Sequence, residues 1–259
     1  MKLQKEWVVA MTLFFGLAAS SPAQQGGVPL EKRMYTDPQS KVLRYRVLKP
    51  EDYDPKKSYP LVLFFHGAGE RGDDNEKQLI HGVPEFAKPA NRKQYPCFLV
   101  APQCPDKQRW VEVDWGALSH KQPAEPSEPM RLTLELLPAL QKEFSIDPQR
   151  IYVTGLSMGS FGTWDIIARK PELFAAAVPI CGGADEATAP KIAKLPIWAF
   201  HGEKDGAVKT VRSRNMIEAL KKAGGEPKYT EYPGVGHDSW GPTYRDPEVF
   251  KWLFAQKRP

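Results

Sequence analysis

A Gly-x-Ser-x-Gly motif at 155–159 is the strongest chemical signal in this sequence. It stands between an uncharged apolar run, 151–154, and a stretch with helical character, 160–169. A sharp turn there would hold the Ser157 hydroxyl clear of the backbone, and the two glycines would let strand and helix approach closely. The amino end of the helix would then lie beneath developing negative charge. This placement favours a nucleophile over a structural serine in a glycine-rich turn.

A serine nucleophile needs a base, and His237 is the best candidate among the five histidines. Where a serine sits on a strand–turn–helix motif, the expected chain order is serine, acid, histidine. His201 and His237 follow Ser157, but no acid at a strand end lies between Ser157 and His201. We therefore interpret His201 as a hydrogen-bonded residue at a strand end. His237 lies in a glycine-containing loop, with a surface histidine as the alternative reading.

The acid must lie at a strand end between Ser157 and His237. Four acids meet this condition: Asp185, Glu186, Glu203 and Asp205. Asp205, just after the apolar run 196–200, is our choice, and Glu203 is the second. The carboxylate would hold the tautomer of His237 and stabilise its imidazolium form.

A glycine-rich bend, His-Gly-Ala-Gly-Glu-Arg-Gly at 66–72, follows the apolar run 61–65. Such a bend can direct backbone N–H groups toward a tetrahedral oxyanion. The expected donors are the N–H groups of Ala68 and Met158. A phosphate-binding loop is the rival interpretation, but the Gly-Lys-Ser/Thr ending is missing.

Uncharged apolar runs alternate with helical patterns along most of the chain. The runs lie at 61–65, 97–101, 151–154, 175–180 and 196–200, and the helical patterns at 130–144, 160–169, 208–223 and 247–256. This alternation predicts an α/β fold with a mostly parallel sheet and helices on both faces. Ligands of such sheets bind at the carboxyl ends of the strands. With no repeat and no linker, a single domain over 24–259 is expected.

Residues 1–23 have the pattern of a signal peptide. Lys2 and Lys5 precede an apolar run, 7–19, and small residues at 20–23 supply a cleavage site. A membrane anchor or a buried helix is the alternative. We therefore expect a secreted or periplasmic protein without stable membrane insertion. The net charge of +5 comes from scattered lysines and arginines, so nucleic acid is not an expected partner.

Three cysteines among 259 residues exclude a disulfide scaffold. Cys97 and Cys104 flank one expected strand and lie too far apart to pair. Cys104 and Cys181 both follow strand ends, so either a disulfide or free buried thiols would fit. Neither a CxxC nor an HExxH motif is present, and no metal site is expected.

The segment after the nucleophile helix is too short to hold a lid. About fourteen residues, 182–195, separate two expected strands, whereas the longest irregular segment is 105–127. We expect an open cleft with aromatic walls, in which Trp110 and Trp240 bind substrate. Core packing is the alternative for any tryptophan, and it is the better interpretation of Trp164 and Trp198.

Together these motifs resemble the α/β-hydrolase superfamily over nearly all of 30–256. The stretches 66–72, 101–105 and 155–164 look like those of secreted esterases related to feruloyl esterases and polyhydroxybutyrate depolymerases, a group that includes proteins labelled as peptidases. The resemblance implies carboxylic ester hydrolysis through an acyl-enzyme, without a cofactor. It also implies Ser157 as nucleophile, His237 as base and Asp205 as the residue that orients the base.

The expected substrates are small-molecule or polysaccharide-linked esters, such as feruloyl, acetyl or short-chain acyl esters. Two other functions stay open at this point. One is a serine peptidase of the same fold, although no large gating domain is present. The other is a non-catalytic carbohydrate-binding protein on a hydrolase scaffold, against which the complete set of serine, histidine and aspartate argues.

Overall fold

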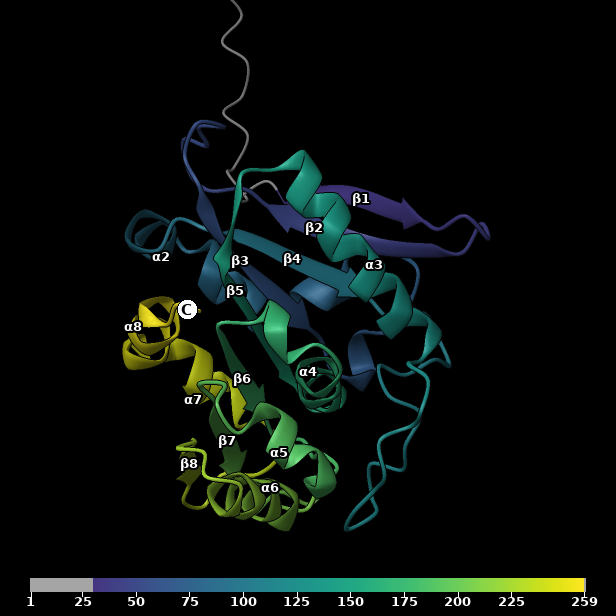
Figure 1. The fold of residues 1–259 in the computed structure, drawn as a ribbon, viewed down its shortest axis with the longest axis vertical. Coiled ribbons are helices and arrows are strands. Elements are labelled where there is room, and N and C mark those ends of the chain that lie inside the picture. Colours follow the sequence, from purple (N-terminus) through teal and green to yellow (C-terminus); the bar gives the residue numbers. More distant parts are fainter. Residues whose placement is uncertain (1–29, 259) are drawn as a thin grey trace, which may run out of the picture.

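The computed structural model describes residues 30–258, in which eight strands form one sheet (Figure 1). The strand order is β1-β2-β4-β3-β5-β6-β7-β8, and β2 is antiparallel to both β1 and β4. The strands are β1 (Glu31–Thr36), β2 (Val42–Leu48), β3 (Tyr59–Phe65), β4 (Phe98–Gln103), β5 (Ile146–Leu156), β6 (Ala176–Ile180), β7 (Trp198–Gly202) and β8 (Lys228–Tyr232). From β4 to β8 all neighbours are parallel. The predicted mostly parallel sheet is confirmed, and the signal peptide expected at 1–23 lies outside the described residues.

Helices pack on both faces of the sheet (Figure 1). Side chains of β3 alternate between two cores, because successive residues of a strand point to opposite faces. One core contains Leu61, Leu63 and Phe65, and the other contains Val62 and Phe64. The first core is covered by α3 (Glu128–Glu143), α4 (Met158–Arg169), α5 (Ala189–Ile192) and α6 (Val211–Lys222), and the second by α1 (Val83–Ala87), α7 (Trp240–Arg245) and α8 (Pro247–Ala255). The short helix α2 (Pro89–Gln94) follows α1. Within the described part of the chain, no helix is both long and apolar enough to cross a bilayer.

The parallel strands bring their carboxyl ends to one edge of the sheet. The turn η1 (Ala68–Glu70) comes shortly after β3, Ser157 directly follows β5, and the loops with Asp205 and His237 follow β7 and β8. Chemistry-bearing residues that are far apart in sequence therefore gather at this edge, as expected for a sheet of this kind.

The irregular segment 105–127 is held firmly against the body of the protein. The guanidinium of Arg169 donates hydrogen bonds to the carbonyl oxygens of residues 123–125. The buried guanidinium of Arg212 donates to the carbonyl oxygen of Ala117 and contacts Nδ1 of His120. These contacts predict a fixed rim instead of a moving flap. The connection from β6 to β7 contains only the turn η4 (Glu186–Thr188) and the short α5, so it forms no lid domain.

The three cysteines are free thiols, and all of them are buried. Of the two alternatives for Cys104 and Cys181, the structure therefore has the unpaired one. Burial raises the pKa of each of these thiols above its ordinary value. They are accordingly protonated near neutral pH.

Candidate active site

Ser157 occupies a strained turn between β5 and α4. Its φ of 52° and ψ of −121° lie in a region that residues with a side chain rarely adopt. The turn is possible only because two glycines flank it. A Cβ on Gly155 would lie 2.4 Å from the carbonyl oxygen of Gly159, and a Cβ on Gly159 would lie 2.1 Å from that of Phe65. The geometry is the one expected from the Gly-x-Ser-x-Gly motif.

His237 bridges Ser157 and Asp205. Its Nε2 lies 2.9 Å from Oγ of Ser157, and its Nδ1 lies 2.7 Å from Oδ2 of Asp205. Since an ionised carboxylate only accepts hydrogen bonds, Nδ1 carries the proton and Nε2 is free to accept one from the serine. The structure thus brings the three predicted residues into one hydrogen-bonded line, in which His237 is partly exposed and Asp205 is buried.

The carboxylate of Asp205 accepts hydrogen bonds at both oxygens. Oδ1 accepts from the N–H groups of Ala207 and Val208, each at 2.9 Å. Oδ2 accepts from His237 and, at 3.1 Å, from Nε2 of His201. Burial alone would raise the pKa of Asp205, but the hydrogen bonds from His201, His237 and Val208 together hold it well below its usual value. Asp205 is therefore ionised throughout the neutral range.

His201 was expected as a hydrogen-bonded residue at a strand end, and the structure places it there. Its imidazole is fully buried, and Nε2 faces two acceptors, Oδ2 of Asp205 and the carbonyl oxygen of Val208 at 3.0 Å. Nδ1 lies 2.7 Å from Oγ of Ser213. The contact with Asp205 is the part that sequence reasoning missed. The only available signal was the four-residue spacing of histidine and aspartate after an apolar run.

The two backbone groups expected to bind an oxyanion each stand at the start of a helical turn. Ala68 is the first residue of η1 and Met158 is the first residue of α4. The N–H groups at the start of a helix have no hydrogen-bond acceptor within that helix. The loop passes directly beside the nucleophile, because a Cβ on Gly67 would lie 3.6 Å from Cβ of Ser157. These two N–H groups can stabilise negative charge at this point.

Trp110 does not line the site, and the expectation that it binds substrate is wrong. Its side chain is fully buried, with the ring centroid 4.6 Å from that of Phe65. Its Nε1–H donates to the carbonyl oxygen of His66 at 3.1 Å. The segment after β4 turns inward here and packs against α4, where a Cβ on Gly162 would meet Trp110 at 2.8 Å. Trp110 therefore supports the backbone that leads into the glycine-rich loop.

His66 fixes the same loop from the other side. Its Nε2 accepts a hydrogen bond from the N–H of Cys104 at 2.9 Å, and Nδ1 lies 2.6 Å from the carbonyl oxygen of Gly67. Burial lowers the pKa of His66 to about 4. The neutral imidazole, protonated at Nδ1, thus ties the start of the loop to the end of β4.

Trp240 lies next to His237, as expected of a residue at the cleft. The two ring centroids are 5.3 Å apart with the planes at 90°. On its other side, the ring of Trp240 lies 5.5 Å from the ring of His81. Trp164 and Trp198, by contrast, are buried in the two cores, which agrees with the interpretation given above.

One group of potential metal ligands lies behind the serine within residues 30–258. It consists of Cys181, Asp205 and His237, whose ligand atoms all lie within 4.8 Å of one another. Asp205 and His237 are already hydrogen-bonded to each other, and burial keeps the thiol of Cys181 protonated. A protonated thiol is a poor metal ligand. We therefore interpret the group as the hydrogen-bonded pair of Asp205 and His237 with the buried thiol of Cys181 nearby.

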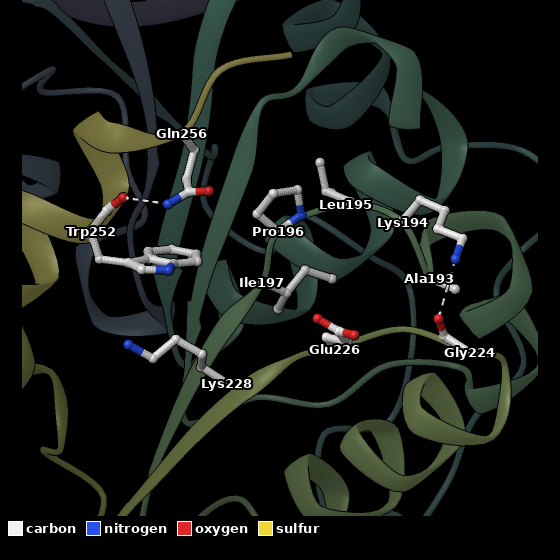
Figure 2. A pocket seen from close by; sticks show the side chains of 10 residues that line it. All are labelled: Ala193, Lys194, Leu195, Pro196, Ile197, Gly224, Glu226, Lys228, Trp252 and Gln256. Carbon is white, nitrogen blue, oxygen red and sulfur yellow. Dashed lines mark hydrogen bonds between the residues drawn. The ribbon is translucent and has the colours of Figure 1, made fainter. Parts of the chain in front are cut away.

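A cavity of about 460 Å³ lies elsewhere in the protein (Figure 2). It is lined by residues 193–197, which precede β7, by Glu226 and Lys228 near the start of β8, and by Trp252 of α8. This places it at the amino ends of these strands, whereas Ser157, Asp205 and His237 follow the carboxyl ends. The cavity is therefore separate from the candidate site.

Known proteins share both sequence and fold with this chain. The model of the Dienelactone hydrolase family matches residues 119–243. Over 192 residues the chain is 26% identical to a probable carboxylesterase of Oryza sativa subsp. japonica, in a match that covers 68% of this chain and 70% of the relative.

Solved structures extend the similarity. A thermostable esterase is 41% identical with a TM-score of 0.83, and the match covers 88% of this chain. The chain spans 63% of the length of that esterase chain. A feruloyl esterase module from Clostridium thermocellum, in complex with sinapinate, is 17% identical with a TM-score of 0.65 and is covered to 89%, which shows the same fold.

Proposed function

Since the chain has an α/β-hydrolase fold, which it shares with solved esterases, we propose that it hydrolyses carboxylic esters with Ser157 as nucleophile, His237 as base and Asp205 as orienting acid. Carboxylesterase relatives and the 41% identical esterase structure support a carboxylic ester hydrolase. The observation that carries the assignment of roles is the hydrogen-bonded line from Ser157 through His237 to the buried Asp205.

In the acylation step, Oγ of Ser157 attacks the ester carbonyl carbon while Nε2 of His237 takes the serine proton. The carbonyl oxygen becomes an oxyanion beside the N–H groups of Ala68 and Met158, each of which contributes roughly 3 kcal/mol to transition-state binding in comparable sites. Collapse of the tetrahedral intermediate breaks the bond to the alcohol oxygen, which receives the proton from His237. A water molecule then attacks the acyl carbon while Nε2 of His237 takes a proton from it. Collapse of the second tetrahedral intermediate breaks the bond to Oγ of Ser157, which receives that proton, and the acid is released.

Asp205 serves this cycle as a fixed negative charge. Because its pKa is held well below the usual value, it stays ionised while His237 gains and loses a proton. An ionised Asp205 keeps the proton of neutral His237 on Nδ1, so that Nε2 faces the serine. It also stabilises the imidazolium that forms transiently.

We propose that the substrates are carbohydrate-linked feruloyl or acetyl esters, or other short acyl esters. Support comes from the connection between β6 and β7, which forms no lid domain, and from the fold shared with the feruloyl esterase module. The proposal includes export to the periplasm or the medium, which depends on the signal-peptide pattern at 1–23. Mass spectrometry of the exported protein tests it, with a new amino terminus near residue 24 as the expected result.

The decisive experiment compares wild type with Ser157→Ala on 4-nitrophenyl acetate. We expect kcat to fall by at least about 1000-fold, because the nucleophile is lost while binding remains. Ser58→Ala is the matched control, since Ser58 is exposed and lies in the loop before β3. Turnover that survives in Ser157→Ala refutes the nucleophile, and an inactive wild type refutes ester hydrolysis. A parallel set of feruloyl, acetyl-xylan and simple acyl esters then ranks the substrates.

A further inference from the structure

The carboxylate of Glu70 is buried next to the nucleophile and has no role in the steps above. Glu70 ends the turn η1, and only 9% of the residue is exposed. A Cβ on Gly67 would lie 2.8 Å from Oε2 of Glu70 and 3.6 Å from Cβ of Ser157. The carboxylate and the nucleophile therefore flank the same glycine.

This carboxylate lacks the partners that a buried charge normally requires. Its Oε2 is buried without a hydrogen-bond partner among the described residues. Its Oε1 lies 3.8 Å from Nε2 of His81, which is beyond hydrogen-bond distance. Oε2 is closed off from solvent, whereas 12% of the side chain is exposed, so a substrate group would meet Glu70 at Oε1, on the His81 side. A hydrogen bond donated there would give this poorly partnered carboxylate a partner.

A row of contacts links Glu70 to His237 through His81 and Trp240. His81, beside Glu70, packs against Trp240, and Trp240 packs against His237. Because Nε2 of His237 passes its proton to the leaving oxygen, groups next to His237 face the alcohol half of the ester. The row from Glu70 to Trp240 is therefore placed to contact the alcohol.

A hollow of about 310 Å³ shares His81 and Trp240 with this row, whereas Glu70 is not part of its lining. Glu85, Asp238 and Arg245 also line the hollow. A lining of aromatic residues with both acidic and basic residues suits a neutral ligand rich in hydroxyl groups better than an anionic or a cationic ligand.

We propose that Glu70, His81 and Trp240 form a subsite for the alcohol half of the ester, which selects a neutral polyhydroxylated alcohol such as a sugar. One hydroxyl donates to Oε1 of Glu70, the oxygen on the His81 side, and the apolar C–H face of the ring packs on Trp240. This inference rests on the proposed ester hydrolysis and adds to it which half of the substrate the subsite recognises, and through which residues.

The test uses esters that share the acetyl group and differ in the alcohol. The probes are 4-nitrophenyl acetate, an acetylated methyl β-xyloside and acetylcholine. In Glu70→Gln we expect kcat/KM on the xyloside acetate to fall about tenfold or more, the scale of one hydrogen bond to a charged group, with less than about a twofold change on 4-nitrophenyl acetate. Glu226→Gln, an exposed carboxylate of the cavity in Figure 2, is the control and should change neither rate.

Equal losses of Glu70→Gln on both acetates, or no loss on either, would overturn the subsite. A preference of the wild type for acetylcholine would show a cation site instead. Should Glu70→Gln fail to fold by circular dichroism, His81→Gln and Trp240→Ala decide through inhibition by methyl β-xyloside, whose inhibition constant should rise; an unchanged constant contradicts the subsite. An inactive wild type on 4-nitrophenyl acetate would instead refute the proposed function.

Discussion

Nε2 of His201 and Oδ2 of Asp205 lie 3.1 Å apart inside the protein, with both side chains completely buried. The same carboxylate oxygen accepts the hydrogen bond from Nδ1 of His237. His201 and His237 therefore share Oδ2 of Asp205. His201 is buried, whereas His237 reaches Ser157. His201 is in this sense a positioning residue, because it acts on Ser157 only through Asp205 and His237.

Replacing His201 should change the pH profile as well as the rate. In His201→Leu the carboxylate of Asp205 loses one of the hydrogen bonds that hold its pKa below the usual value, so the pKa of Asp205 rises. We expect the acid limb of kcat/KM to move to higher pH, with kcat lowered about tenfold and KM little changed. His201→Gln retains an N–H donor and should show a smaller change. A loss of thermal stability with an unmoved acid limb would mean that His201 serves packing alone.

Gly159 should tolerate no side chain, because a Cβ there would lie 2.1 Å from the carbonyl oxygen of Phe65 and 2.7 Å from that of His66. Backbone atoms cannot move away as a flexible side chain can. Gly159→Ala should therefore lower the free energy of unfolding by about 3 kcal/mol or more, measured by urea denaturation. Gly206→Ala is the control, since nothing lies within 4 Å of its Cβ position. Similar stabilities of the two variants would contradict the close approach of β3 and α4.

Trp110→Phe should weaken the protein without weakening substrate binding. The substitution leaves the carbonyl oxygen of His66 without its indole donor, which should cost about 1–3 kcal/mol in unfolding free energy. Since His66 precedes the glycine-rich loop, kcat should fall while KM stays near the wild-type value. Trp115→Phe is a matched control, because Nε1 of Trp115 has no acceptor among the described residues. A raised KM together with an unchanged free energy of unfolding would instead indicate that Trp110 contacts the substrate.

His66 should make the protein sensitive to mild acid. Its pKa in the folded protein is about 4, below the ordinary value of 6.5, because of burial. Between these two values the unfolded chain binds a proton that the folded protein does not, so the free energy of unfolding falls as the pH falls from 6.5 toward 4. At pH 4.5 the loss from this residue should be roughly 2–3 kcal/mol relative to pH 7.5. Urea denaturation at both pH values checks this, with His66→Gln expected to lose less stability; an equal loss in the two proteins would assign the acid sensitivity to other groups.

Local patterns in the sequence were enough to predict the sheet and to single out Ser157, Asp205 and His237, which the structure joins by hydrogen bonds. Apolar runs and helical periods depend on near neighbours, and the Gly-x-Ser-x-Gly turn excludes side chains for reasons that act within a few residues. Elements without such a pattern were not predicted. The charged, half-exposed β1 at the edge of the sheet and the short helices α1, α2 and α7 are examples.

Tertiary structure decided the direction of side chains in irregular segments. Trp110 and Trp240 looked alike as loop tryptophans, yet Trp110 packs beneath the glycine-rich loop and Trp240 packs beside His237. The sequence analysis gave Glu70 no role, and the fold buries it next to Gly67. The sequence by itself determined the succession of the predicted strands and helices along the chain and the positions of Ser157, Asp205 and His237 between them. Burial and contact partners depend on how all segments pack together, near and far in the sequence, so only the packed molecule settles which polar groups are left without a partner.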